Sequence, residues 1–300
     1  MNIIFMGTPD FSVPSLEKIF HSHHKILAVV TSPDRERGRG QKISYTPVKE
    51  FALKINLPIL QPERLKDDNF VRSLKELAPD LCVVVAFRIL PREVYSIPKY
   101  GSFNLHASLL PKYRGAAPIQ WSIINGDKET GVTTFALEDK VDTGNIFIQK
   151  KLEILDNDNF GAVHDKLSII GAEAVMETID LIDKGNFTLM DQDDTLASPA
   201  PKINKEHGLI DWNKTASEIN NLIRGLSPYP GAYFYFKDKI IKIYNASAIK
   251  EKVLKPGEIF SSKEELIIGC GQYALNVLEL QQEGRKKLSI PEFLRGFNFS

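Results

Sequence analysis

The pattern of apolar and polar positions predicts alternating strands and helices over roughly the first 185 residues. The continuous apolar run at 81–87, rich in β-branched residues, is typical of a parallel strand buried on both faces. Apolar residues spaced i, i+3, i+4 over 159–185 predict one or two helices that end at Lys184 and Gly185. Further strands are expected at 2–6, 24–32, 101–106 and 130–138, and a helix at 13–20. The alternation predicts an α/β fold with a Rossmann-like, mainly parallel sheet.

The pattern changes in the last third of the chain. Residues 190–206 are polar and rich in Pro and Asp, as expected of an interdomain linker. A helix is predicted at 215–226, where Thr215 and Glu218 have the spacing of a capping box. Short strands separated by turns follow, which favours a smaller OB-like β-barrel. The chain is therefore divided into a catalytic domain at 1–189, a linker at 190–206 and a C-terminal domain at 207–300.

Composition adds little to this division. The chain has 38 Lys and Arg against 38 Asp and Glu, so no global field indicates a nucleic-acid partner. Residues 201–300 nevertheless hold 15 basic against 11 acidic residues, which leaves a polyanionic partner open. Cys82 and Cys270 lie in apolar surroundings and are expected to be buried thiols. No spaced Cys/His motif supports a disulfide framework or a metal site, so no metal is expected.

The first residues also bear on location. The N-terminal stretch lacks the basic and apolar regions of a signal peptide, and no apolar run approaches the length of a membrane span. We therefore expect a cytoplasmic protein without a membrane partner. The absence of a coiled-coil pattern or an obvious apolar edge favours a monomer.

Three polar residues follow predicted strands in a pattern that suggests chemistry. Asn104 and His106 are two residues apart at a strand end, so their side chains lie on one face. Asp142 lies in the loop 138–145, before Thr143 and Gly144. A lone histidine is more often structural, and an Asp in a turn often only caps it. An amide, an imidazole and a carboxylate together nevertheless suit acyl transfer, which needs an oxyanion donor and a proton carrier.

A basic segment and a glycine are the other candidate features. The run at 32–50 includes basic residues on a glycine-containing loop: Arg35, Arg37, Arg39 and Lys42. By itself this run favours a solvated loop over a nucleic-acid arm. Gly7 follows the first strand, but without the further glycines of a dinucleotide fingerprint, and Pro9 and Asp10 argue against close approach of a pyrophosphate.

The segments 103–121 and 136–147 resemble the formyltetrahydrofolate-dependent formyltransferases in content, order and separation. The resemblance implies that Asn104, His106 and Asp142 form a catalytic triad, with Asn104 as oxyanion donor, His106 as proton carrier and Asp142 assisting it. It also implies a folate site and makes 10-formyltetrahydrofolate the formyl donor. The residues implied for this site are Phe87, Arg88, Ile89, Leu90, Ser108, Leu109, Leu110, Pro111, Asp139 and Val141.

Within that family the whole chain resembles the branch that formylates the α-amino group of initiator methionyl-tRNA. The N-terminal segment 6–19, the basic loop and the segment 200–234 carry this likeness. The resemblance implies that the basic loop contacts the acceptor end and that the C-terminal domain contacts the stem. The residues implied for tRNA binding are Arg35, Arg37, Arg39, Lys42, Lys237, Lys239, Lys242, Arg285, Lys286 and Lys287.

One segment departs from the family, and three alternatives stay open. Residues 86–91 are one residue shorter than the family's Ala-Tyr-Gly-x-Ile-Leu-Pro form and lack its glycine. The alternatives are glycinamide ribonucleotide formylation, formylation of a sugar-nucleotide amine, and a non-catalytic RNA-binding protein. The length and the segment 200–234 disfavour the first. The basic loop and that segment disfavour the second, and the three polar residues disfavour the third.

Overall fold

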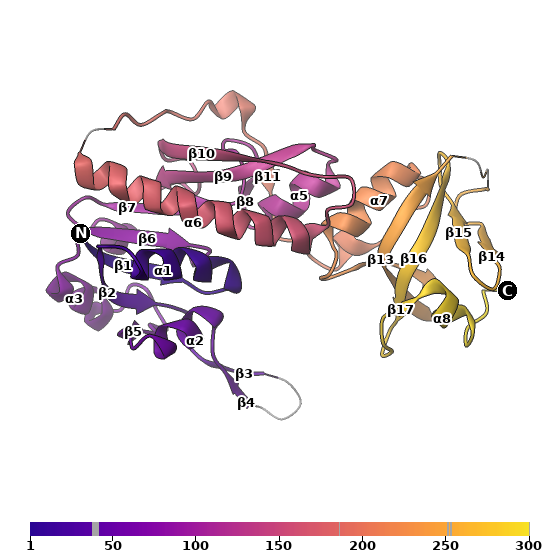
Figure 1. Cartoon of the computed structure of the whole chain (residues 1–300), viewed down its shortest axis with the longest axis horizontal. Coiled ribbons are helices and arrows are strands. Elements are labelled where there is room, and N and C mark those ends of the chain that lie inside the picture. The colour runs from indigo at the N-terminus through magenta and orange to yellow at the C-terminus, as the bar shows by residue number, and fades with distance from the viewer. Residues whose placement is uncertain (38–41, 186, 251, 253, 300) are drawn as a thin grey trace. The chain divides into compact units, whose positions relative to one another are not determined.

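The computed structural model describes residues 1–37, 42–185, 187–250, 252 and 254–299. The chain forms two compact units, coloured along the chain in Figure 1. The first unit comprises Met1–Gly115, Gly131–Leu152 and His164–Pro199, and the second comprises Ala116–Thr130, Glu153–Val163 and Ala200–Ser300. Residues 116–130 thus belong to the second unit although they lie within the range predicted for the first domain.

The first unit is built on a seven-stranded sheet with the order β10-β9-β7-β6-β1-β2-β5. The pairs β1–β2, β1–β6, β6–β7 and β2–β5 are parallel, and β9 is antiparallel to β7. The predicted α/β fold with a mainly parallel sheet is therefore confirmed. The strands are β1 (Asn2–Gly7), β2 (Lys25–Val30), β5 (Ile59–Leu60), β6 (Leu81–Val85), β7 (Ser102–His106), β9 (Glu129–Ala136) and β10 (Ile146–Glu153).

Helices and short elements surround this sheet. The main helices are α1 (Val13–Phe20), α2 (Pro47–Lys54), α3 (Asp68–Leu77), α4 (Arg92–Tyr95) and α6 (Phe160–Lys184). The short elements are η1 (Asp10–Ser12), β3 (Arg35–Arg37), β4 (Lys42–Ser44), β8 (Arg114–Gly115), η2 (Asp194–Leu196) and β11 (Pro199–Ala200). The pattern at 159–185 thus forms one continuous helix. In this helix, the Thr178 hydroxyl is hydrogen-bonded to the Thr134 hydroxyl on β9, and Gly171 lies against Leu105 of β7.

Apolar side chains on both faces hold the central strands in the interior of the first unit. Every residue of β6 is buried, as the run of β-branched residues predicts. Its Cys82 is 1% exposed, and Cys270 of the second unit is 3% exposed, so both thiols are buried as expected. Tight packing of this kind holds the carboxyl ends of β6 and β7 in fixed register, with Val84 beside Asn104.

The second unit contains an antiparallel sheet of six strands. Its order is β12-β13-β16-β15-β14, and β17 pairs with β16. The strands are β12 (Ala232–Phe236), β13 (Lys239–Ile249), β14 (Ile259–Ser261), β15 (Leu266–Gly269), β16 (Ala274–Gln282) and β17 (Leu288–Ser289). The helices are α5 (Pro118–Ile124), η3 (Glu206–Gly208), α7 (Ala216–Gly225) and α8 (Ile290–Leu294). A smaller antiparallel β domain after the parallel sheet agrees with the prediction.

The start of α7 confirms a local prediction. The Thr215 hydroxyl accepts the backbone N–H of Glu218 at 3.2 Å, and the Glu218 carboxylate accepts the N–H of Thr215 at 2.9 Å. These two bonds form the predicted capping box. The apolar face of α7, with Ile219 and Ile223, then packs into the core of the second unit.

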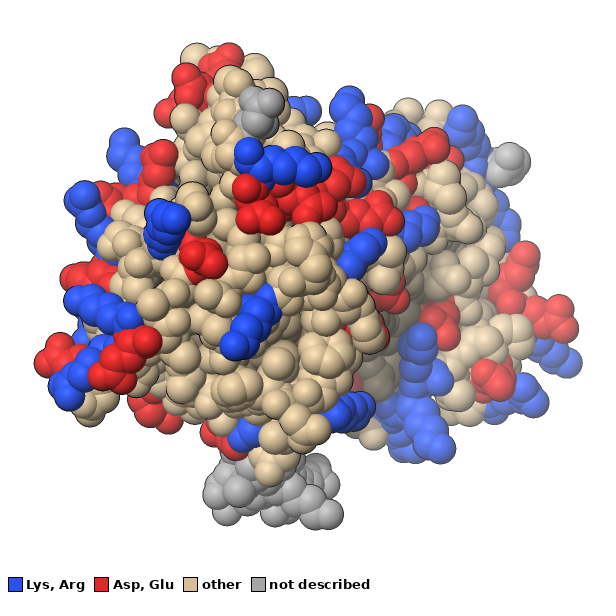
Figure 2. Space-filling view, turned by 60° about the vertical axis from the view of Figure 1, so that its left-hand side comes forward, with Lys and Arg blue, Asp and Glu red and all other residues tan. Residues whose placement is uncertain are grey.

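None of the helices in the described part of the chain is both long and apolar enough to cross a lipid bilayer. On the face shown in Figure 2, Lys and Arg side chains are interspersed with Asp and Glu over much of the surface. This distribution agrees with the absence of net charge.

Candidate active site

His106 is the last residue of β7, at the carboxyl end of the parallel strands. Its side chain is 6% exposed, and its ring meets that of Phe135 on β9 edge-on, with centroids 6.5 Å apart. The buried strands on either side fix the backbone of this residue, so the imidazole has little freedom to move. In open α/β sheets ligands bind outside the carboxyl ends of the strands, where His106 lies.

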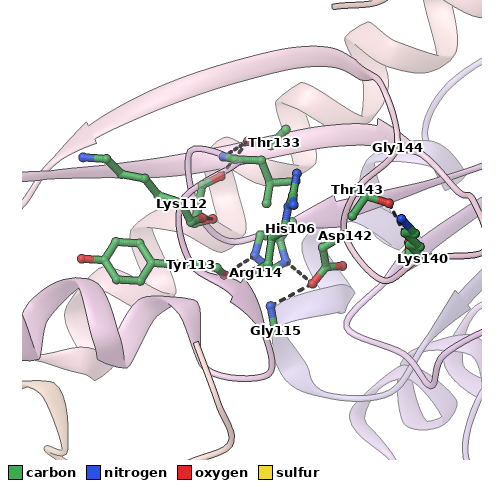
Figure 3. A network of polar contacts seen from close by, with 12 residues as sticks. His106, Lys112, Tyr113, Arg114, Gly115, Thr133, Lys140, Asp142, Thr143 and Gly144 are labelled. Atoms are coloured by element: carbon green, nitrogen blue, oxygen red, sulfur yellow. Dashed lines mark hydrogen bonds and ion pairs between the residues drawn. The ribbon is translucent and has the colours of Figure 1, made fainter. Parts of the chain in front are cut away.

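Two neighbours of this imidazole indicate which ring nitrogen carries the proton and which one faces a carboxylate (Figure 3). Its Nε2 lies 2.8 Å from the carbonyl oxygen of Tyr113, which can only accept, so Nε2 carries a proton and donates it. Its Nδ1 lies 3.9 Å from Oδ2 of Asp142. The structure therefore brings two of the predicted catalytic residues together. It leaves Nδ1 as the ring nitrogen that can exchange a proton.

Asp142 is presented by a constrained loop. Its backbone has φ 57°, in the left-handed region that Asp and Asn tolerate better than most residues. The carboxylate is 11% exposed and accepts the backbone N–H of Gly115 at 2.9 Å. This bond fixes the direction of the carboxylate toward the imidazole.

Sequence reasoning missed Gln192 and Arg114, which hold the loop of Asp142 in place. The Gln192 amide donates to the carbonyl oxygens of Asp142 at 3.1 Å and of Gly144 at 2.8 Å. The Gln192 carbonyl in turn accepts two bonds from the Arg114 guanidinium, at 3.2 and 2.7 Å. Arg114 immediately precedes Gly115, so both ends of this network meet at the carboxylate. Gln192 is 50 residues from Asp142 in sequence, and no local signal links the two.

A second network supports the turn after His106. The Thr133 hydroxyl donates to the Ser108 carbonyl at 2.7 Å and accepts the backbone N–H of Leu110 at 3.1 Å. The Gln149 amide donates to the Leu110 carbonyl at 2.7 Å and to Thr133 Oγ1 at 3.0 Å. These bonds hold the chain between His106 and Tyr113, and thereby the carbonyl that accepts from Nε2.

Asn104 lies on the same strand, two residues before His106, with a partly buried side chain. Alternation along the strand puts it on the same face as His106, as predicted. Its side-chain amide makes no hydrogen bond with any residue that the structure describes. An amide of this kind can donate to a ligand oxygen placed beside His106.

The residues expected to bind folate lie in three segments, which follow β6 (87–90), β7 (108–111) and β9 (139–141). In the shortened segment, Ala86 has φ 46°, the conformation for which a glycine would be favoured. The Arg88 guanidinium donates to the carbonyl oxygens of Pro62 at 2.8 Å and Glu63 at 3.0 Å. Burial lowers the pKa of Arg88. Arg88 is thus bound to the protein, whereas Ile89 is 74% exposed.

The other expected folate residues divide into structural and accessible ones. Ser108 is buried and its hydroxyl donates to the Lys112 carbonyl, while Leu110 packs against Phe135. Val141, in contrast, is 50% exposed. Phe87, Leu109 and Pro111 are partly buried, Leu90 is buried, and Asp139 is exposed and accepts the Tyr95 hydroxyl at 2.6 Å.

A cavity of about 700 Å³ lies beside the loop that carries Asp142. Asp139, one of the predicted folate residues, lines this cavity, and so does Gln192. Its other walls come from α4, the loop and the segment after residue 190. They are Arg92, Tyr95, Ser96, Leu137, Glu138, Lys140, Thr143, Asn145, Asp191 and Asp194.

The basic loop expected to bind tRNA forms a hairpin in the first unit. Strands β3 and β4 are antiparallel, with Arg35 opposite Ser44 and Arg37 opposite Lys42. Arg35 is exposed. Arg39 lies outside the described residues.

The predicted tRNA residues of the second unit differ in their surroundings. Lys242 donates to the Pro230 carbonyl at 2.7 Å and lines a cavity of about 470 Å³. Lys287, in contrast, is paired with Glu279 at 2.9 Å. The cavity is also lined by Lys202 and Lys205, two basic residues that the predicted set lacks. Lys237, Lys239, Arg285 and Lys286 are exposed.

Comparison with known proteins identifies the family of this chain. The model "Formyl transferase" matches residues 1–179, and "Formyl transferase, C-terminal domain" matches residues 202–298. The chain therefore belongs to the formyl transferase family. It is 48% identical over 301 residues to the "Methionyl-tRNA formyltransferase" of Caldanaerobacter subterraneus subsp. tengcongensis, covering 99% of this chain and 97% of that protein. The protein of the same name from Pelotomaculum thermopropionicum is 46% identical, covering 99% and 96%.

Solved structures share the fold at lower identity. WlaRD, a sugar 3N-formyl transferase crystallised with dTDP and 5-N-formyl-THF, superposes with a TM-score of 0.71 at 21% identity, covering 95% of this chain and 99% of that one. HypX from Aquifex aeolicus in complex with tetrahydrofolic acid gives 0.68 at 18% identity, covering 97% of this chain. This chain spans about half the length of HypX. These likenesses bear on the fold alone.

Proposed function

We propose that this formyltransferase moves the formyl group of 10-formyltetrahydrofolate to the α-amino group of initiator methionyl-tRNA. The product, N-formylmethionyl-tRNA, would serve translation initiation. The main support for this proposal is the match over nearly the full length, at 46–48% identity, to two relatives named "Methionyl-tRNA formyltransferase". The placement of His106 against Asp142 at the carboxyl edge of the sheet supports acyl-transfer chemistry.

The reaction sets definite requirements for the site. The amine attacks the formyl carbon, and the carbonyl oxygen becomes an oxyanion. Collapse then breaks the bond to N10, which must gain a proton while the attacking nitrogen loses one. A free α-amine has a pKa of about 7.7–8.0, and the esterified amino acid is a weaker base, so much of it is unprotonated at neutral pH. Stabilising the oxyanion and moving the proton are therefore the tasks of the protein.

The proposal gives these tasks to the three predicted residues, and the geometry supports it. The Asn104 amide donates to the oxyanion. His106 keeps Nε2–H on the Tyr113 carbonyl and exchanges its proton through Nδ1. Asp142, 3.9 Å from Nδ1, stabilises the imidazolium whenever Nδ1 is protonated. That separation exceeds hydrogen-bond length, so a substrate proton can reach Nδ1 beside the carboxylate.

The donor occupies the carboxyl edge of the sheet between the segment 86–91 and the loop of Asp142. The exposed apolar side chains of Ile89 and Val141 suit contact with a pterin ring, and the cavity beside the loop adds room. For the tRNA, the hairpin with Arg35 contacts the acceptor end. The second unit contributes Lys242 to phosphate binding, with Lys202 and Lys205 at the same cavity.

The test is incubation of the chain with 10-formyltetrahydrofolate and one of two acceptors. These are charged methionyl-tRNA and a free amino-sugar nucleotide. After hydrolysis of the ester, mass spectrometry is expected to find N-formylmethionine from the tRNA reaction and no formylated sugar. Formyl transfer only to the sugar amine would contradict the substrate assignment, and transfer to neither would contradict the activity.

A further inference from the structure

A histidine cluster outside the active site has no role in the proposed reaction. Three of the six histidines of the chain fall within four residues, His21, His23 and His24, in the turn between α1 and β2. The side chain of His24 is fully buried and that of His23 is 72% exposed. The rings of His23 and His24 are neighbours, with centroids 4.0 Å apart.

Helix α6 adds two carboxylates to this cluster. Asp180 and Asp183 are three residues apart, so they lie on one face of the helix. His24 Nε2 is 3.4 Å from Asp180 Oδ1, and His23 Nε2 is 3.9 Å from Asp183 Oδ2. One ligand atom each from His23, His24 and Asp183 lies within 4.8 Å of the other two. In Figure 1 the N-terminus lies on the same side of the first unit as the end of α6.

These separations are close to what a tetrahedral metal ion needs. Bonds of about 2.0–2.2 Å from zinc to nitrogen and oxygen place neighbouring ligand atoms about 3.3–3.5 Å apart. The His24–Asp180 pair already has this separation, and the His23–Asp183 pair is about 0.5 Å wider. The ligand atoms of His23, His24 and Asp183 lie within 4.8 Å of one another, so the exposed side chains of His23 and Asp183 must move toward His24 to complete the site. Two imidazoles with carboxylates favour zinc over calcium or magnesium, which prefer all-oxygen sites.

His24 is prepared to act as a ligand. Its Nδ1 lies 3.0 Å from the amino group of Met1, which donates to it, so the neutral ring carries its proton on Nε2. A metal ion at Nε2 would displace that proton. Nδ1 would then take a proton from the Met1 ammonium and donate it back to the resulting amine. One proton in total would leave to solvent, as metal binding commonly requires.

We propose that His23, His24 and Asp183, with Asp180 beside them, form a structural zinc site that ties the turn before β2 to α6. No sequence motif indicated it, because the carboxylate of Asp180 comes from a residue 156 positions after His24. The site shares no residue with the formyl-transfer machinery. The zinc site can therefore be tested independently of the proposed function.

The test uses the full chain without a polyhistidine tag, titrated with ZnCl2 by calorimetry and with Co²⁺ as an optical probe. The variants are His23→Ala and Asp183→Asn, whose exposed side chains can be changed without disturbing the core. His21→Ala is the matched control, since it removes a neighbouring exposed histidine that is not one of the proposed ligands. Thermal unfolding with and without ZnCl2 gives a second readout, because a ligand that binds only the folded state raises Tm.

We expect one Zn²⁺ per chain and a Co²⁺ spectrum typical of a four-coordinate site. Either variant should weaken binding at least about tenfold, the lower end of the loss seen when even an outer partner of a metal ligand is removed. His21→Ala should stay within about twofold of the unchanged chain, below that threshold. Zinc should raise Tm in the unchanged chain and in the control only. Absence of stoichiometric binding, or equal affinity in His23→Ala and the unchanged chain, would overturn the proposal.

Discussion

His106 is the residue on which the proposed chemistry most depends. Its Nε2 is committed to the Tyr113 carbonyl, so the ring can serve a substrate only through Nδ1. We expect His106→Ala to lower kcat for formylation by about 10²–10⁴-fold, the usual contribution of a positioned proton carrier, with folate affinity largely kept. Single-turnover kinetics with saturating 10-formyltetrahydrofolate measures the effect on the chemical step. A rate within a few-fold of the unchanged enzyme would exclude His106 from proton transfer.

Substitutions of Asp142 can distinguish the role of its negative charge from its role in shaping the loop. Asn has the same shape, tolerates the left-handed φ of 57°, and can still accept the Gly115 N–H. Asp142→Asn should therefore lower kcat by about 10²–10⁴-fold, as for His106, while stability changes little. Asp142→Ala should lose stability as well, since it leaves that N–H without its partner and strains the backbone. Unfolding midpoints beside kcat distinguish the two effects. Full activity in Asp142→Asn would mean that the carboxylate only shapes the loop.

His24 makes stability depend on pH. Burial is the main cause that lowers its pKa below 6.5, so in the folded state it resists protonation that the unfolded chain accepts. Its contribution is present above pH 6.5 and is lost as pH falls through 6.5 toward the lower folded value. In metal-free buffer, the stability advantage of the unchanged chain over His24→Gln should shrink between pH 7.5 and 5.5. Urea unfolding at both pH values measures this, and a constant difference would contradict it.

At the scale of elements, the segment after α6 positions the loop of Asp142. Gln192→Leu removes both bonds to the loop carbonyls while keeping a similar volume, so kcat should fall about 10-fold or more as Asp142 loses its orientation. Asp194→Asn is the control, because Asp194 also binds Arg114 but has a 79% exposed side chain, and its bond to Arg114 does not involve the loop carbonyls. Steady-state kinetics should show an effect on kcat for Gln192→Leu alone. Equal effects of both changes would indicate a general loss of structure.

The sequence predicted individual elements better than their connections. The buried run of β6, the single face of Asn104 and His106 and the capping box at Thr215 are all local patterns, and the structure contains each of them. Gln192 was hidden in a polar segment interpreted as a linker. Its role depends on bonds to residues about 50 and 80 positions away. Hydrophobic periodicity records which face is buried, but it carries no information about such polar partners.

At the scale of the whole molecule, tRNA binding should depend on which basic side chains are already paired with a carboxylate. Lys242 lines a cavity with two further lysines, whereas the charge of Lys287 is paired with Glu279. Lys242→Ala should reduce the magnitude of the log–log salt slope of tRNA affinity by about 0.9, the contribution of one duplex phosphate. Lys287→Ala should change it much less. Binding measured over a series of salt concentrations compares them, and a reversed order would contradict the assignment.

The two buried cysteines give each compact unit its own chemical reporter of unfolding. Burial raises the pKa of the Cys82 thiol to about 12 and that of Cys270 to about 11. Neither forms the reactive thiolate near neutral pH while its unit stays folded. Cys82 belongs to the first unit and Cys270 to the second. Labelling with a maleimide in increasing urea, followed by peptide mass spectrometry, therefore resolves whether the halves of the enzyme open together or one before the other, without any engineered probe.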